Sequence, residues 1–184
     1  MADGPPPDFT EHRLTSKLVY DGRLLRVRED SVRLPDGKTA RREWVQHPGA
    51  VIIIALLDEN TVLMERQFRY PLGRHFYELP AGKIEPGEEA LATAQRELIE
   101  ECGYSAKSWR HLATLHPCIG YSDERFELYL ARDLTHVGRA LDDGEFLEVL
   151  PMAVAEVRNF IRDGRITDVK VVTGLAWLDW LVER

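Results

Sequence analysis

The feature that most restricts the fold is a loop beginning at Gly82 that leads into an amphipathic segment, residues 88–102. Apolar residues recur there every three or four positions, which predicts a helix with one buried face. They are Leu91, Ala94, Leu98 and Cys102. Gly103 follows at the position where many helices end in a left-handed glycine. The rest of the chain must therefore supply an apolar surface on which this helix can pack.

Three carboxylates share another face of the expected helix. Glu97 and Glu101 are four residues apart, and Glu100 is three residues from Glu97, so all three side chains project to one side. Arg96 can neutralise only part of this charge. Hard divalent cations with oxygen ligands would offset the remainder, and Mg²⁺ is the usual choice near phosphates. A solvated acidic surface is the common alternative for such a face, but the joined glycine loop and arginine favour a metal site.

Apolar runs elsewhere predict a mixed sheet. Residues 50–57 form a short β-branched run that is typical of a buried central strand, with 61–67 as its hairpin partner. Residues 17–46 predict two or three antiparallel strands around a Pro-Asp-Gly turn. Further strands are expected at 76–79, 112–115, 126–131 and 146–150, and helices at 153–162 and 170–182. This order is typical of a mixed sheet packed between helices.

Composition narrows the classes of partner. The 24 basic and 31 acidic residues give a net charge of −7, which opposes binding to long nucleic acids. The longest apolar run, 50–57, is shorter than the ~20 residues of a membrane helix, and the N-terminus lacks an export signal. Two cysteines without a CxxC spacing fit a reducing compartment. We therefore expect a cytoplasmic protein with a small-molecule ligand, no nucleic acid and no membrane.

The segment 82–104 resembles the signature of the Nudix hydrolase family, Gly-x5-Glu-x7-Arg-Glu-apolar-x-Glu-Glu-x-Gly-apolar. The matching residues are Gly82, Glu88, Arg96, Glu97, Leu98, Glu100, Glu101, Gly103 and Tyr104. With residue frequencies near ~7% per fixed letter, a chance match in such a chain has odds on the order of 10⁻⁷. The resemblance implies an α/β (α+β) Nudix fold, in which a mixed β-sheet is sandwiched between helices, with a small N-terminal antiparallel sheet.

Flanking residues resemble the ADP-ribose pyrophosphatase subfamily. The segments that carry this likeness are 65–70, 76–82 and 116–125, with departures at Cys118 and Ile119, where the subfamily commonly has Ser and Pro. The resemblance implies Mg²⁺-dependent hydrolysis of ADP-ribose to AMP and ribose 5-phosphate, with Mn²⁺ as a substitute metal. The alternatives are another nucleoside diphosphate sugar such as GDP-mannose, an oxidised nucleoside triphosphate, or a non-catalytic ligand-sensing module. The extended N-terminal strands favour a diphosphosugar.

The resemblance also implies roles for residues near the helix. Glu97, Glu100, Glu101 and the carbonyl of Ala81 are the expected metal ligands. Arg96 is expected to orient the glutamates, so that Arg96 and Glu100 both support catalysis. In related enzymes the general base often lies on a late loop, and the acidic stretch 141–148 is in the right region. Glu145 is our candidate base ahead of Glu148, although an acidic turn before a strand is the plainer explanation.

Substrate contacts are expected from three further residues. Arg42 and Arg69 are candidates for phosphate or ribose contacts, because arginine forks match phosphate oxygens. Trp44 could stack on adenine, and an exposed strand aromatic or a dimer contact is the alternative. The expected organisation is a tail at 1–13, N-terminal strands at 14–48 that form a dimerisation element, and a Nudix catalytic domain at 49–184. The resemblance implies a homodimer.

Overall fold

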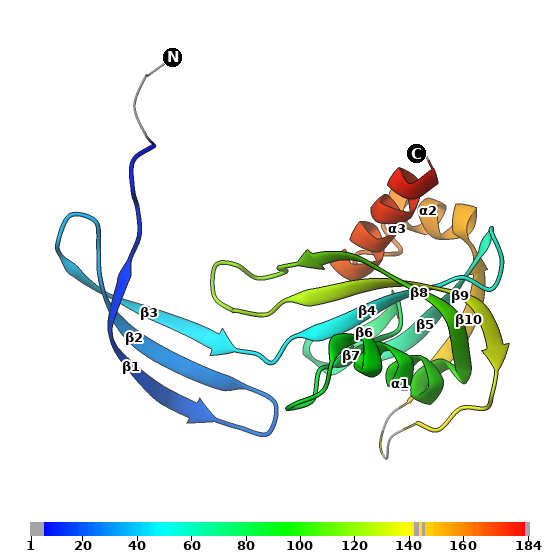
Figure 1. Ribbon diagram of the computed structural model, residues 1–184, viewed down its shortest axis with the longest axis horizontal. Coiled ribbons are helices and arrows are strands. Elements are labelled where there is room, and N and C mark those ends of the chain that lie inside the picture. The colour runs from blue at the N-terminus through cyan, green and yellow to red at the C-terminus, as the bar shows by residue number, and fades with distance from the viewer. Residues whose placement is uncertain (1–5, 142–143, 145, 183–184) are drawn as a thin grey trace. The chain divides into compact units, whose positions relative to one another are not determined.

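The computed structural model describes residues 6–141, 144 and 146–182 (Figure 1). The chain divides into two compact units, one made of residues 1–47 with 118–124 and the other of residues 48–117 with 125–184. None of the helices in the described part combines the length and apolar character needed to span a membrane. The loop 118–124 belongs to the N-terminal unit although it lies far along the sequence, which the sequence did not predict.

The N-terminal unit is a three-stranded antiparallel sheet in the order β1-β2-β3. Its strands are β1 His12–Asp21, β2 Arg26–Arg33 and β3 Thr39–Gln46. Strand β1 begins at His12, which pairs with Arg33, so two residues of the expected tail are part of the sheet. The segment 118–124 attaches to β3, because the N–H of Val45 donates to the carbonyl of Tyr121 at 2.8 Å. The small N-terminal sheet expected from the sequence is present.

In its described residues the larger unit holds two sheets and three α-helices. One sheet has the order β7-β4-β9-β8, with β4 parallel to β9, and the other has the order β10-β5-β6 with antiparallel pairs. The strands are β4 Ala50–Ala55, β5 Thr61–Arg69, β6 Arg74–Glu78, β7 Ala81–Lys83, β8 Tyr104–Leu115, β9 Phe126–His136 and β10 Leu147–Ala153. The helices are α1 Ala90–Cys102, α2 Val154–Arg162 and α3 Val169–Val182, and a 3₁₀ turn η1 spans Tyr70–Leu72.

Strand β4 is buried on both faces, which explains its unbroken apolar sequence. Ile52 and Ile54 point into a cluster that includes residues of α2 and α3, whereas Val51 and Ile53 point into a second cluster that includes residues of α1. Helices therefore cover both faces of the sheet (Figure 1), as the fold class predicted. Each fully buried Ile or Val contributes roughly 1.5–3 kcal/mol relative to exposure, so β4 anchors the structure that carries α1.

Helix α1 packs as its periodicity predicted, with one exception. Ala94, Leu98 and Cys102 are buried in the cluster on its side of the sheet. Leu91 was expected on the same face but is exposed, and its neighbour Ala90 packs on the cluster instead. The helix starts at Ala90 rather than at residue 88 because residues 86–88 form the end of the preceding loop. Gly103 ends the helix at φ 77°, the left-handed conformation that the sequence indicated.

Candidate active site

Arg96 is the centre of the carboxylate cluster on α1. Its Nε and Nη2 donate to the two oxygens of Glu88 at 3.1 Å each, and Nη1 donates to Glu97 and Glu100 at 2.8 Å each. One guanidinium therefore holds three carboxylates, one from the loop and two from the helix. These contacts are consistent with the orienting role that the family resemblance implies for Arg96, and that role stays a prediction.

The charges of this cluster shift the pKa values of its members. Hydrogen bonds from Arg96, opposed by partial burial, lower the pKa of Glu88 to about 2. The same contacts raise the pKa of Arg96 above its ordinary value, with Glu88 the largest cause and Glu100 and Glu97 adding to it. Glu88 and Arg96 are therefore both charged at neutral pH.

The loop before α1 is fitted closely to the helix. A Cβ atom at Gly82 would lie 1.9 Å from Cδ of Glu97, so only glycine leaves room for this carboxylate. The backbone N–H of Ala81 donates to Oε2 of the buried Glu101 at 3.1 Å. The structure therefore brings together Ala81, Glu97, Glu100 and Glu101, four of the residues that the sequence proposed as metal ligands.

Helix α1 is also fixed to strand β5 through a buried polar contact. The Sγ of Cys102 donates to Oε1 of Glu65 at 3.2 Å, and both residues are buried. Burial, together with Glu65, raises the pKa of the Cys102 thiol, so it remains a protonated donor. The contact adds one more carboxylate beneath the acidic face of the helix.

The donor chemistry of this cluster fits a hard divalent cation. Glu88, Glu97, Glu100 and Glu101 carry four negative charges against the single positive charge of Arg96, and oxygen is the ligand atom that such cations prefer. Within the described ranges, no three Asp, Glu, His or Cys side chains already surround one point. Three of the four carboxylates, Glu88, Glu97 and Glu100, instead lie on Arg96, so a cation would bind by sharing them with, or taking them from, the guanidinium.

A second ion-pair network lies at the ends of β5 and β6 and was only partly expected. Arg69 forms a fork with Glu78, Nε to Oε1 at 2.6 Å and Nη2 to Oε2 at 2.8 Å. Lys170, in the first turn of α3, donates to the same Oε2 at 2.9 Å and pairs with Asp168 at 3.0 Å. Arg69 also interacts electrostatically with Glu101, which raises the pKa of Arg69 in addition to the larger effect of Glu78.

Sequence reasoning had selected Arg69 but not Glu78, Asp168 or Lys170. One signal was available, because a lysine in the first turn of a helix is opposed by the helix dipole. Such a position needs a nearby anion, and Glu78 and Asp168 provide it. Burial alone would raise the pKa of Glu78, but hydrogen bonds from Arg69 and Lys170 outweigh it and hold that pKa below its ordinary value.

The other predicted residues lie elsewhere. Arg42 and Trp44 are on β3 of the N-terminal unit, where Arg42 forms a fork with Glu11 at 2.5 and 2.8 Å. Trp44 donates its indole N–H to the buried Asp30 at 3.0 Å. Glu145 lies outside the described residues. Its alternative, Glu148, is exposed on β10 and pairs with Arg66 at 3.5 Å.

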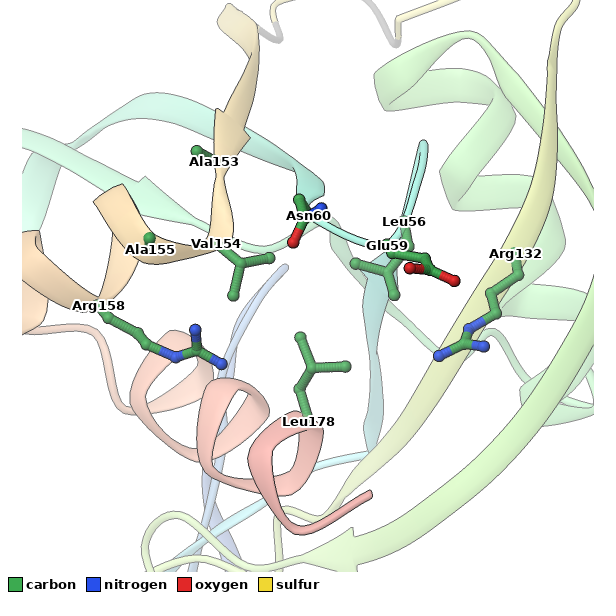
Figure 2. A pocket seen from close by; sticks show the side chains of 9 residues that line it. All are labelled: Leu56, Glu59, Asn60, Arg132, Ala153, Val154, Ala155, Arg158 and Leu178. Atoms are coloured by element: carbon green, nitrogen blue, oxygen red, sulfur yellow. The ribbon is translucent and has the colours of Figure 1, made fainter. Parts of the chain in front are cut away.

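A cavity of about 710 Å³ lies away from the carboxylates of α1, between the β4–β5 turn and helices α2 and α3. Figure 2 shows Arg132 and Arg158 on opposite sides of it. Its apolar lining includes Leu56, Val154 and Leu178, and Arg158 is paired with Asp179. It contains none of the glutamates described above, so the chemistry is assigned to the α1 cluster rather than to this hollow.

Comparison with known proteins identifies the class. A model described as the NUDIX domain matches residues 46–172, and one described as the nucleoside diphosphate sugar hydrolase N-terminal domain matches residues 11–45. The chain therefore belongs to the Nudix hydrolase family. Within the family, it is an enzyme of the ADP-ribose pyrophosphatase or nucleoside diphosphate sugar hydrolase type.

Among the relatives that match nearly the whole chain are two from Bacillus. The chain is 38% identical to the methanol dehydrogenase activator of Bacillus methanolicus, over 92% of this chain and 93% of that protein. It is 36% identical to the ADP-ribose pyrophosphatase of Bacillus subtilis (strain 168), over 91% and 92%. A crystal structure of an ADP compounds hydrolase, 21% identical, superposes with a TM-score of 0.86 over 97% of each chain. It shows the same fold.

Proposed function

We propose that this Nudix hydrolase cleaves ADP-ribose to AMP and ribose 5-phosphate with Mg²⁺, as a cytoplasmic homodimer. The observation that carries the chemistry is the cluster on α1, where Arg96 gathers Glu88, Glu97 and Glu100 beside the Gly82 loop. The similarity to the B. subtilis ADP-ribose pyrophosphatase supports the choice of substrate.

In this proposal Glu97, Glu100, Glu101 and the Ala81 carbonyl hold the metal. When bound, divalent cations supply Lewis-acid polarisation of the diphosphate and a more acidic water. Arg96 fixes the directions of Glu97 and Glu100, and the N–H of Ala81 fixes Glu101.

The substrate contacts and the base complete the proposal. Arg69 would bind the diphosphate, since its guanidinium interacts electrostatically with Glu101 of the metal cluster and is hydrogen-bonded to Glu78. Arg42 would bind phosphate or ribose, and Trp44 would stack on the base. Glu145 would take the proton of the attacking water, with Glu148 as the alternative.

The substrate is tested by measuring phosphate-containing products, released by an added phosphatase, with and without Mg²⁺. The panel contains ADP-ribose, GDP-mannose, FAD, NADH, diadenosine polyphosphates and 8-oxo-dGTP. We expect Mg²⁺-dependent turnover that is highest with ADP-ribose. A second candidate is another nucleoside diphosphate sugar, because the model that matches residues 11–45 is described for that whole class. Higher turnover of GDP-mannose would establish it, and binding of ADP-ribose without any turnover would indicate a sensor.

The metal ligands are tested with Glu101→Gln. We expect turnover at saturating Mg²⁺ to fall by a factor on the order of 10² or more, because the variant loses one charge at the metal. Glu156→Gln, an exposed carboxylate on α2, is the control. A near-normal rate for Glu101→Gln would contradict the assignment. Comparing Glu145→Gln with Glu148→Gln identifies the base, since only the base variant should lose the fall in rate at acid pH that comes from protonating the base.

A further inference from the structure

The network at the ends of β5 and β6 alternates in charge along its length. It runs from Arg69 to Glu78, then to Lys170 and Asp168, through contacts of 2.6–3.0 Å. Glu78 is only 3% exposed, so its partners fix it in a region where solvent screens charges weakly. The four groups come from β5, β6 and the start of α3, and they join these elements.

All four members of this network line one cavity, but they differ in how exposed and how engaged they are. Arg69 keeps 45% of its side chain exposed and, with Arg74 and Phe76, lines a cavity of about 370 Å³. The Lys170 side chain is 17% exposed, and its ammonium group is already engaged by Glu78 and Asp168. Arg69 is therefore the more exposed cation of the cavity and can contact a ligand directly, whereas the ammonium group of Lys170 is occupied by Glu78 and Asp168.

Lys170 also occupies a position that local structure disfavours. Its ammonium group is buried, which opposes its charge, and it lies in the first turn of α3, where the helix dipole repels a cation. Attraction to Asp168 and Glu78 outweighs the burial, so the pKa of Lys170 remains above its ordinary value. A methionine would pack at this position without burying a charge and without opposing the helix dipole, so packing alone does not explain a lysine.

We propose that Lys170 is a positioning residue for substrate binding, which holds the Glu78 carboxylate so that Glu78 directs the Arg69 guanidinium toward the diphosphate. This inference rests on the proposed function, in which Arg69 contacts the diphosphate. Because Oε2 of Glu78 accepts from both cations, loss of Lys170 leaves Arg69 as the one cation that holds this carboxylate among the four groups of the network. It also leaves Asp168 without its pairing partner, so Asp168 competes with Glu78 for the Arg69 guanidinium.

The experiment compares Lys170→Met with Lys170→Arg, and Lys107→Met on the exposed surface of β8 is the matched control. Two quantities are measured, the KM and kcat for ADP-ribose and the Kd for ADP by calorimetry. We expect Lys170→Met to raise both KM and Kd about tenfold while kcat changes less than about threefold, since ground-state and transition-state binding are lost equally. Lys170→Arg restores most of the affinity, and Lys107→Met matches the wild type.

A double-mutant cycle with Arg69→Met separates positioning from a general structural effect. If Lys170 acts through Arg69, Lys170→Met weakens ADP binding no further when Arg69 is already replaced. Multiplicative losses would overturn the proposal, and so would an unchanged KM and Kd in Lys170→Met. If Lys170→Met does not fold, Lys170→Gln carries the same comparison, because it keeps a hydrogen-bond donor without the charge.

The same data separate this inference from the proposed function. A wild type that does not hydrolyse ADP-ribose refutes the proposed substrate, while the ADP titration still tests the link between Lys170 and Arg69. ADP binding that does not depend on Arg69 refutes the link itself.

Discussion

Replacing Arg96 with methionine tests whether a cation and the guanidinium serve the same carboxylates. Arg96 donates four hydrogen bonds of 2.8–3.1 Å to Glu88, Glu97 and Glu100. Hydrogen bonds to charged groups contribute about 1.5–3 kcal/mol each when shielded. The guanidinium is 30% exposed, so water screens the carboxylates once it is removed. We therefore expect the metal-free variant to lose about 2 kcal/mol of unfolding free energy.

Saturating Mg²⁺ should reduce this loss. The variant lacks the group that competes for Glu97 and Glu100, so a cation that binds these carboxylates should bind the folded variant more tightly than the wild type. Ligand binding to the folded state adds stability in proportion to the logarithm of one plus the ratio of ligand concentration to Kd. Turnover should nevertheless fall, because the carboxylates lose their common orientation.

The assay is urea unfolding followed by tryptophan fluorescence, in EDTA and in saturating Mg²⁺. Arg162→Met, an exposed arginine on α2, is the control and should change stability by less than about 0.5 kcal/mol. A stability gap between wild type and Arg96→Met that stays equal or widens in Mg²⁺ would refute the reasoning, because it would mean that the cation does not use the carboxylates held by Arg96.

Three further changes test the loop and the ends of α1. Gly82→Ala places a Cβ 1.9 Å from Cδ of Glu97, so the Glu97 carboxylate must rotate out of its present position. We expect turnover to fall about tenfold in kinetic assays, and the free energy of unfolding, measured in urea, to change by less than about 0.5 kcal/mol. Glu88 has a pKa of about 2 in the fold against an ordinary 4.5, so its pairing with Arg96 stabilises the protein fully above pH 4.5, and this stabilisation is lost as pH falls toward 2. The melting temperature of Glu88→Gln should therefore fall less steeply with acid pH than that of the wild type, and equal slopes would contradict the pairing. Gly103→Ala should lower the free energy of unfolding by about 1–2 kcal/mol, because φ is 77° and the new Cβ would lie 3.0 Å from a backbone nitrogen. An unchanged midpoint of urea unfolding would show instead that the end of the helix relaxes.

The strands that the sequence predicted well are those whose burial is uniform. Strand β4 is buried on both faces, so its apolar run was visible without any partner. Strand β8 was expected only at residues 112–115 but spans Tyr104–Leu115. The part before residue 112 carries exposed charges such as Lys107 and Arg110, and it is held in the sheet by pairing with β9. That pairing is a long-range interaction that local periodicity does not record.

The two ion-pair networks also differ in how far local sequence predicts them. The Arg96 cluster could be predicted because Glu88, Glu97 and Glu100 lie within eight residues of Arg96, on a loop and a helix of known geometry. The contact between Glu78 and Lys170 joins residues 92 positions apart, and it exists only because α3 packs over the end of β6. The dipole argument could have singled out Lys170, but no local rule names its partner.

The chain connects these networks over a very short distance. Glu78 ends β6 and Ala81 begins β7 only three residues later, and the N–H of Ala81 holds Glu101. The two residues between them are Leu79, fully buried against α3 near Gly174, and Pro80, whose φ is fixed by its ring. Such a rigid connection fixes the position of Glu78, and through it that of Arg69, relative to the carboxylates of α1. The helix that packs on Leu79 also carries Lys170, so α3 fixes both the connection and the ion pair that directs Arg69.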